Sequence, residues 1–329
     1  MPGDQGHNAL RTAGTGAPGH TVSAFESMGD LNAIVCATLT KDYGSHRALD
    51  HLDLEVRAGE IFGYLGSNGA GKTTTIRCLL DLIRPSDGTA SVLGLDSRRD
   101  SVEVRRRTGY LPGDLRVWSR LTAREMLGYL GKLRGGVSAQ RVTDLAERLD
   151  CDLTQRCGAM SHGQRQKVGV IQAFMHDPEV LVLDEPTATL DPLMQRIVHD
   201  LIREARDGGA TIFVSSHDLP EIAHLCDRAG ILRRGRLVTV LDVGDLADRG
   251  RHVISIQFLE PVAPEAFESL PGVTDVSATD HTVTVTVSGD LDPVVKTAAR
   301  YRVHDLHSAE VDLDEVFRDY YRPEPGDAH

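Results

Sequence analysis

The sequence predicts an α/β protein with a largely parallel sheet, followed by a smaller α+β unit. Before residue 250, short apolar segments alternate with segments of helical periodicity, an order typical of a sheet covered by helices. A glycine-rich loop at residues 66–73 stands between a predicted strand and a predicted helix. Beyond residue 250, apolar and polar residues alternate along the chain, which indicates antiparallel strands.

The first elements surround the glycine-rich loop. Residues 1–30 are rich in Gly, Ser, Thr, Ala and Pro without a sustained period, which predicts a disordered tail. Apolar residues after the loop, at spacings i, i+3, i+4 and i+7 up to Ile83, predict a helix that stops before Pro85. Three strands are predicted before that helix: Ile34–Leu39, Leu52–Val56 and Glu60–Leu65.

The middle of the chain contains most of the predicted helices. Residues 114–150 are expected to be mostly helical. Ser161 and Gln164 fit a capping box, so a helix should begin there. Asp191, followed by a proline, predicts a further helix start. Two all-apolar or nearly apolar segments between helices predict buried parallel strands: Val180–Leu183 and Thr211–Val214.

The last part of the chain predicts a small domain of its own. The expected order β-α-β-β-α-β-α indicates a ferredoxin-like α+β domain. We therefore divide the chain into a tail at 1–30, an α/β domain at 31–248 and an α+β domain at 249–329. The elements expected in the last domain are strands at Val253–Phe258 and Thr282–Val287, and helices at Pro264–Leu270, Asp292–Arg300 and Asp314–Tyr321.

Charge and composition exclude several classes of protein. The formal net charge is −12, from 48 acidic and 36 basic residues, which argues against a general nucleic-acid binder. No apolar stretch approaches the roughly 18–20 residues that span a bilayer, and the N-terminus has no secretion-signal pattern. The five cysteines form no CxxC pair and are expected to be reduced thiols that fill the core.

The glycine-rich loop carries the strongest chemical signal. Residues 66–73 match the pattern G-x4-G-K-[ST]. Glycines at these positions let backbone N–H groups surround phosphate oxygens, and the following helix presents its positive N-terminus to the same anions. Lys72 should reach the β- and γ-phosphates, and the Thr73 hydroxyl should ligate Mg²⁺.

Two carboxylates follow the predicted strand Val180–Leu183. Asp184, at the carboxyl end of a buried strand, is a candidate ligand of Mg²⁺. Glu185 lies where a water could attack the γ-phosphate, and it is therefore the candidate general base. The alternative is that the paired acids only cap the end of the strand.

These motifs, in this order and spacing, resemble those of an ATPase of the ABC transporter superfamily. The resemblance covers residues 32–245 and includes the segment from Met160 to Gln164. His217 resembles the switch histidine of that family, and Tyr43 resembles the aromatic residue that stacks on adenine. The ATP-binding residues that the resemblance implies are Tyr43, Gly66, Ser67, Asn68, Gly69, Ala70, Gly71, Lys72, Thr73 and Thr74.

The resemblance implies a nucleotide-binding domain that works as a dimer, as a homodimer or as paired ATPase subunits. Two ATP molecules would lie between the subunits, each between one phosphate loop and the signature segment of the other subunit, with Asp191 in the dimer loop. Glu185 and His217 would be catalytic, and Thr73 and Asp184 would hold Mg²⁺. The signature residues are Ser161, His162, Gly163 and Gln164.

The partner that the resemblance implies is a separate integral-membrane permease, which places the chain at the cytoplasmic face of the membrane. The segment Leu115–Met126, with the chain's one tryptophan at Trp118, resembles the surface that receives the permease; a buried structural tryptophan is the alternative. The C-terminal domain resembles the extension of drug- and antibiotic-exporting systems, through the segment Leu313–Phe317 and the Tyr320–Tyr321 pair. These features imply export of a drug, an antibiotic or another small hydrophobic compound.

Three positions depart from the family pattern. His162 stands where the signature segment usually has glycine, and Ala188 stands where a serine is usual. Gly113 occupies the position of a glutamine that ordinarily touches Mg²⁺ and senses the permease, and Asp114 is a candidate substitute. Gly163 is retained beside His162, so the phosphate contact is expected to survive, and Ala188 removes one hydroxyl contact across the dimer. The departure at Gly113 bears on the coupling to the partner more than on the expected ATPase activity.

Two other classes of protein are alternatives to a transporter subunit. A soluble ABC ATPase that acts on ribosomes or DNA usually has two cassettes or long basic or coiled-coil inserts, and this sequence has neither. A metabolic P-loop kinase would leave the segment Ser161–Gln164 and His217 without a role. Co-purification with a membrane protein, with ribosomes or DNA, or with neither would separate the three.

Overall fold

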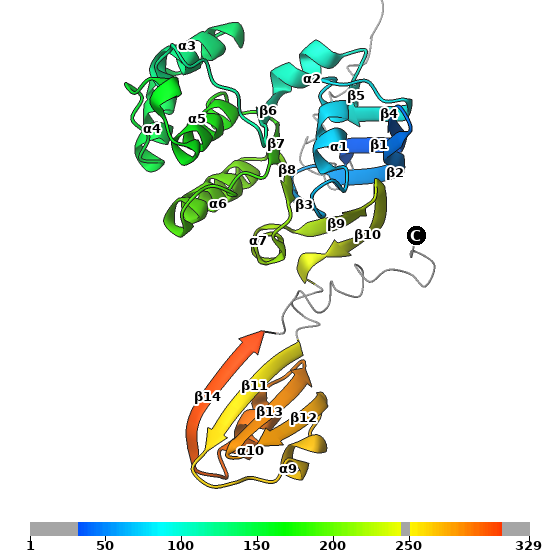
Figure 1. Ribbon diagram of the computed structural model, residues 1–329, viewed down its shortest axis with the longest axis vertical. Helices are drawn as coiled ribbons and strands as arrows, with labels where there is room; N and C mark the ends of the chain where they lie inside the picture. The colour runs from blue at the N-terminus through cyan, green and yellow to red at the C-terminus, as the bar shows by residue number, and fades with distance from the viewer. Residues whose placement is uncertain (1–31, 245–250, 311–329) are drawn as a thin grey trace, which may run out of the picture.

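The computed structural model describes residues 32–244 and 251–310 (Figure 1). The expected tail at 1–30, the expected boundary between residues 248 and 249, and the expected helix Asp314–Tyr321 lie outside the described residues. Within the described ranges, no helix combines the length and the apolar character that crossing a membrane requires.

The centre of the first unit is a six-stranded sheet in the order β10-β9-β3-β8-β7-β6. The neighbours from β9 to β6 are parallel, and β10 adds an antiparallel edge strand. The strands are β3 (Ile61–Leu65), β6 (Thr108–Leu111), β7 (Val180–Asp184), β8 (Thr211–Ser216), β9 (Arg228–Arg233) and β10 (Arg236–Asp242).

A second, antiparallel sheet lies beside the first and has the strand order β2-β1-β4-β5. Its strands are β1 (Asn32–Tyr43), β2 (His46–Arg57), β4 (Asp87–Val92) and β5 (Leu95–Asp96). Helix α1 (Lys72–Leu79) packs against strands of both sheets. The first two predicted strands are thus correct but longer than expected, because they pair with each other beyond their apolar cores.

The central sheet is buried on both faces because successive side chains of a strand point to opposite sides. Phe62 and Tyr64 of β3 and Phe213 of β8 pack toward the second sheet and α1. Their neighbours along the strands, Ile61 and Ile212, pack into a cluster on the opposite face. These near-continuous apolar strands are what the sequence predicted at Val180–Leu183 and Thr211–Val214, and the α/β fold class is confirmed.

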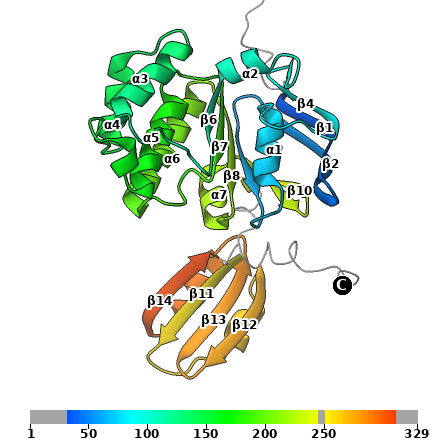
Figure 2. The same ribbon diagram turned by 45° about the horizontal axis from the view of Figure 1, so that its top comes forward.

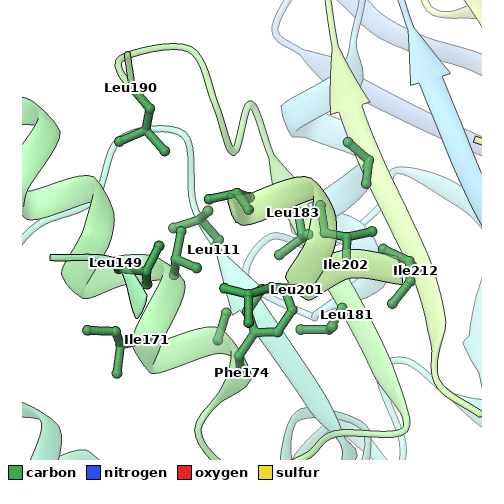
Figure 3. Packing of buried hydrophobic residues seen from close by; sticks show 14 of the residues in the cluster. Leu111, Leu149, Ile171, Phe174, Leu181, Leu183, Leu190, Leu201, Ile202 and Ile212 are labelled. Carbon is green, nitrogen blue, oxygen red and sulfur yellow. The ribbon is translucent and has the colours of Figure 1, made fainter. Parts of the chain in front are cut away.

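Helices cover the opposite face of the central sheet (Figures 1 and 2). Figure 3 shows Leu181, Leu183 and Ile212 of the sheet packed with Ile171 and Leu201 of the helices. The helices of this unit, α1 apart, are α2 (Ser101–Arg107), α3 (Ala123–Leu133), α4 (Ala139–Arg148), α5 (His162–Phe174), α6 (Pro192–Asp207) and α7 (Leu219–Leu225), with a short 3₁₀ helix at Cys157–Ala159.

Both predicted helix starts are confirmed. Ser161 caps α5, and Ser161 and Gln164 exchange the two hydrogen bonds of a capping box. Asp191 caps α6, where its carboxylate accepts hydrogen bonds from the backbone N–H groups of Leu193 and Met194 at 3.0 Å. These side chains satisfy backbone donors that the first helical turn leaves free.

The helix after the glycine-rich loop is shorter than predicted. The apolar spacing extends to Ile83, but α1 ends at Leu79. Asp81 adopts a left-handed conformation with φ of 50°, and the N–H groups of Leu82 and Ile83 return to the carbonyl of Arg77. Leu79 and Leu80 are buried in the core. The apolar spacing therefore reflects burial of this segment, and the burial continues past the last residue of the helix.

Over its described residues, the last unit has the predicted order β-α-β-β-α-β. Its sheet is antiparallel, in the order β12-β13-β11-β14, and α9 and α10 cover a core around Phe258, Phe267 and Val285. This is the ferredoxin-like arrangement. The elements are β11 (Arg251–Phe258), α9 (Glu265–Glu268), β12 (Val273–Thr279), β13 (Thr282–Ser288), α10 (Asp292–Ala298) and β14 (Val303–Glu310).

The packing between the two sheets predicts a large effect of truncating Phe213. Its ring stacks on Phe62 at 5.9 Å and contacts Tyr64 at 5.1 Å between centroids, and it is fully buried. Phe213→Ala should lower the free energy of unfolding by about 3–5 kcal/mol, measured by denaturant titration. Leu193→Ala, at a side chain that is 64% exposed, is the control, and equal small effects of both would contradict this packing.

Candidate active site

The candidate site lies where three neighbouring parallel strands end. Gly66 follows β3, Glu185 follows β7 and His217 follows β8. In open α/β sheets, the carboxyl ends of the strands form the crevice that binds ligands. The register places Leu65 beside Ser216 and Asp184 beside Ser215, so the loops that follow these strands emerge together.

The glycine-rich loop has backbone conformations that other residues rarely adopt. Gly69 and Gly71 have φ angles of 82° and 117°, in the region that favours glycine. A Cβ atom on Gly71 would lie 2.8 Å from the carbonyl oxygen of Ala48. The two glycines therefore allow the close, left-handed turn that leads into α1, whose free N–H groups favour anions.

Lys72 is buried at the first position of α1. Its Nζ atom donates a hydrogen bond to the carbonyl oxygen of Gly66 and lies 3.3 Å from Oε1 of Glu185. The side chain thus crosses the loop and joins the end of β3 to the end of β7. An ammonium held in this position faces the space where phosphates would lie beside the loop.

Asp184 forms the centre of a buried set of oxygen atoms. Thr73 donates to its Oδ2 at 2.8 Å, and Ser215 donates to its Oδ1 at 2.5 Å. Carboxylate and hydroxyl oxygens are the ligands that Mg²⁺ prefers. The two residues expected to hold Mg²⁺, Thr73 and Asp184, are therefore in direct contact, and their chemistry fits that ion.

Glu185 occupies a backbone conformation that non-glycine residues rarely adopt. Its φ angle is 52°, and such strain clusters at functional sites. Its N–H donates to the carbonyl oxygen of Ser215 at 3.1 Å, which holds the turn against β8. Its Oε2 atom lies 2.8 Å from Nδ1 of His217. Glu185 is only partly exposed, whereas His217 is largely exposed, so the pair stands at the rim of the site.

A pocket of about 580 Å³ opens between the loop and the carboxylates, within the range of ligand sites. It contains eight of the ten predicted ATP-binding residues, together with Asp184, Glu185 and His217. Gly66 and Ala70 do not line it; Gly66 serves through its carbonyl, and Ala70 is buried in the core. The eight residues are Tyr43, Ser67, Asn68, Gly69, Gly71, Lys72, Thr73 and Thr74.

The signature segment Ser161–Gln164 and Asp191 do not line this pocket within the one chain. Ser161, His162 and Gln164 are exposed at the start of α5, as is Asp191 at the start of α6. A buried contact ties α5 to the site: Gln166 donates through Nε2 to the carbonyl oxygens of Glu185 and Pro186, at 3.3 and 3.0 Å. The predicted site residues thus fall into two groups: one lines the pocket, and the other lies on a separate exposed surface.

The three departures from the family pattern lie close to these surfaces. Gly113 lines the pocket, where a Cβ atom would lie 3.3 Å from Oδ2 of Asp184. Asp114 and Ala188 also line the pocket and are exposed. His162 is exposed in the signature segment, so its side chain requires no rearrangement of the core.

Sequence reasoning missed several residues of the pocket and its support. His46, Arg77 and Tyr110 line the pocket, and burial, with the nearby Asp184, raises the pKa of Tyr110 to about 12. Ser215 donates to the carboxylate of Asp184, and Gln166 donates to the backbone carbonyl oxygens of Glu185 and Pro186. Arg77 lies four residues, about one turn, beyond Thr73 in α1, a spacing that could have identified it. The others come together only through strand pairing and helix packing.

The fold and the site define a P-loop ATPase. A family model described as "ABC transporter" matches residues 49–188, and a model described as "AAA domain, putative AbiEii toxin, Type IV TA system" matches residues 154–223. The bacitracin transport ATP-binding protein BcrA of Bacillus licheniformis is 39% identical over 234 residues, which span 69% of this chain and 76% of that protein. BcrA of Enterococcus faecalis is 35% identical over 251 residues, spanning 75% and 82%. The chain belongs to the family of ABC transporter ATP-binding proteins.

Solved structures agree with this assignment. The ATP-binding subunit of an ABC transporter matches with a TM-score of 0.60 and 29% identity, covering 65% of this chain and 91% of that chain. A dimeric ATP-binding cassette in a post-hydrolysis state, bound to ADP and Pi, matches with a TM-score of 0.59 and 20% identity, covering 64% and 98%; this similarity concerns the fold. The chain is thus an ATP-binding transporter subunit that hydrolyses ATP.

The position of Lys72 predicts a loss of nucleotide affinity when its charge is removed. Lys72→Ala deletes a buried ammonium that lines the pocket and should raise the Kd for ATP by about tenfold or more, since charge-assisted hydrogen bonds contribute roughly 1.5–3 kcal/mol. Titration with a fluorescent ATP analogue measures the Kd. Lys132→Ala, on α3, is the control. An unchanged affinity in Lys72→Ala would contradict the assignment of the loop.

Proposed function

We propose that the chain supplies the energy for export of an antibiotic, drug or other small hydrophobic compound through a separate integral-membrane permease. The observation that carries the proposal is the 39% identity to a bacitracin transport ATP-binding protein over most of both chains. A probable multidrug ABC transporter ATP-binding protein of Escherichia coli, YbhF, is 34% identical over 228 residues, although these cover only 37% of its length. Both names support export of toxic compounds.

The residues around Asp184 would hold the metal of the nucleotide. Thr73 and Asp184 supply hard oxygen ligands, and Mg²⁺ bound there would neutralise charge on the phosphates. Ser215 holds Oδ1 of Asp184 from the opposite side. The Asp184 carboxylate is buried and fixed by both hydroxyls, so little reorganisation would accompany nucleotide binding.

Glu185 and His217 would perform the hydrolytic step. Glu185 would accept the proton of the attacking water as the water oxygen bonds to the γ-phosphorus and the bond to the leaving ADP oxygen breaks. His217, 2.8 Å from Glu185, would orient that carboxylate and contact the γ-phosphate. Lys72, 3.3 Å from the same carboxylate, would stabilise the phosphate charge.

The exposed start of α5 would complete the site of a second subunit. Ser161 caps this helix, and its free N–H groups and positive dipole suit a γ-phosphate across a dimer interface. Asp191, exposed at the start of α6, would stand in the same interface. Two ATP molecules would then lie between paired subunits, identical or related.

The permease would bind near Trp118. This side chain is 47% exposed and lies edge-on to Tyr129, which is 52% exposed, with ring centroids 5.4 Å apart. Trp118 is therefore not the buried structural residue that was the alternative. Exposed aromatic side chains are enriched at protein interfaces. A permease bound here would hold the chain at the cytoplasmic face of the membrane.

Residues 31–248 would form the ATPase domain and residues 249–329 an accessory domain. Among the described residues, the buried apolar side chains between Ile254 and Ala298 form a cluster of their own, which supports a unit with an independent core. A regulatory or dimer-bracing role fits a domain that follows the cassette.

Replacement of the proposed base tests the hydrolytic step. Glu185→Gln should bind ATP with nearly unchanged affinity but lower kcat by about a hundredfold or more, because general-base catalysis contributes about 10²–10⁴. The variant should also form an ATP-dependent dimer, seen by size-exclusion chromatography with light scattering. Glu179→Gln alters an acid before β7 that pairs with Arg107 away from the pocket and is the control. Wild-type turnover in Glu185→Gln would exclude Glu185 as the base.

Co-purification from membranes tests the transport function. The full chain should co-purify with a multi-span membrane protein from detergent-solubilised membranes of its own cells, and bacitracin or related compounds should stimulate the ATPase activity of that complex severalfold in liposomes. Trp118→Ala should reduce retention, whereas Leu193→Ala should not. Retention on ribosomes or DNA instead of a membrane protein would overturn the proposal.

A further inference from the structure

A buried carboxylate outside the pocket joins the two chain segments that carry the Glu185–His217 pair. Glu221, on α7, has a side chain that is 7% exposed. Its Oε1 atom accepts hydrogen bonds from the hydroxyl of Thr187 at 2.5 Å and from Nε2 of His199 at 3.2 Å. Its Oε2 atom accepts from the hydroxyl of Ser216 at 2.7 Å. One side chain thus connects three elements.

Three hydrogen-bond donors face the Glu221 carboxylate, an arrangement that favours its ionised form. Burial alone would raise the pKa of Glu221, but the hydrogen bonds from His199, Thr187 and Ser216 outweigh burial and lower the pKa. A buried charge that is fully hydrogen-bonded holds its partners firmly, and removal of the charge leaves them without an equivalent acceptor.

Two of the partners of Glu221 lie within two residues of the catalytic pair in the sequence. Thr187 follows Glu185 by two residues, and Ser216 immediately precedes His217. The Ser216 hydroxyl also accepts the N–H of Asp218 at 3.0 Å, so the turn that carries His217 is held from both sides. The carboxylate therefore sets the relative position of the two loops across which Glu185 meets His217.

Helix α6 belongs to the same cluster. His199 comes from this helix, and Gln195 donates to the carbonyl oxygen of Thr187 at 3.4 Å. The helix is capped by Asp191, the residue proposed to stand in the dimer interface. Glu221 thus connects the middle of α6, at His199, to the catalytic turn, and it does not line the pocket.

We propose that Glu221 is a positioning residue for ATP hydrolysis. Through Thr187 and Ser216 it fixes the position of Glu185 relative to His217. Through His199 it links that arrangement to α6. This inference rests on the proposed roles of Glu185 and His217. Because Glu221 does not line the pocket, we expect it to contribute to the turnover step rather than to binding.

The test separates turnover from binding in the full-length chain. Glu221→Gln keeps the shape of the side chain but replaces one acceptor oxygen with a donor group. It should lower kcat by about tenfold to a hundredfold, as small misplacements of catalytic groups do, with KM and the Kd for ATP within about twofold of wild type. Glu204→Gln, an acid on α6 that pairs with Arg148 on the surface, is the matched control.

Variants of Thr187 keep the proposal testable if Glu221→Gln is unstable. Thr187→Val removes the hydroxyl and should lower kcat as Glu221→Gln does, whereas Thr187→Ser should restore turnover. In the double variant Glu221→Gln with Thr187→Val, the losses should not multiply, because both remove the same link.

Two results would overturn the inference. One is a kcat of Glu221→Gln within twofold of wild type. The other is a fall in kcat that accompanies equal losses in Tm and nucleotide affinity, with independent effects at Thr187, which would mark Glu221 as a structural residue only. Either result leaves the wild-type ATPase activity, and hence the proposed function, intact; an inactive wild-type chain would instead contradict the proposed function.

Discussion

The buried carboxylate of Asp184 is the interaction on which the site depends. It terminates β7 in a sheet that is covered on both faces, where an unpaired charge would be costly. Thr73 at the start of α1 and Ser215 near the end of β8 each donate to one of its oxygens. The helix that follows the phosphate loop, strand β7 and strand β8 are therefore held together at one point.

The remaining features of the pocket extend from that point. Glu185 follows Asp184 in a left-handed conformation and is held to Ser215 through its backbone. Lys72 reaches across from α1 to the Glu185 carboxylate. Behind the turn, Gln166 of α5 binds the carbonyls of Glu185 and Pro186. Hydrogen bonds and an ion pair from three elements, α1, α5 and β8, thus converge on one short turn.

The chain also has exposed surfaces whose proposed roles require a second molecule to bind there. The signature segment and Asp191 are exposed helix starts, each with its own cap. The Trp118–Tyr129 pair is exposed beside α3. Pocket and surfaces are linked within the subunit by buried polar contacts, because α5 and α6 each place one end at the surface and polar side chains against the catalytic turn.

The sequence alone determined the local elements and the chemistry of the motifs. Glycine spacing, the lysine and threonine after it, the paired acids after an apolar strand and both helix caps depend on near neighbours in the chain, so they were predictable. The end of α1 was not, because the apolar pattern to Ile83 reflects burial rather than helix. The sequence also did not predict the roles of Ser215, Gln166 and Glu221, because each forms a hydrogen bond with a residue 19 to 34 positions away. Only strand order and helix packing bring such residues into hydrogen-bonding distance, so the tertiary structure decided how the catalytic carboxylates are held.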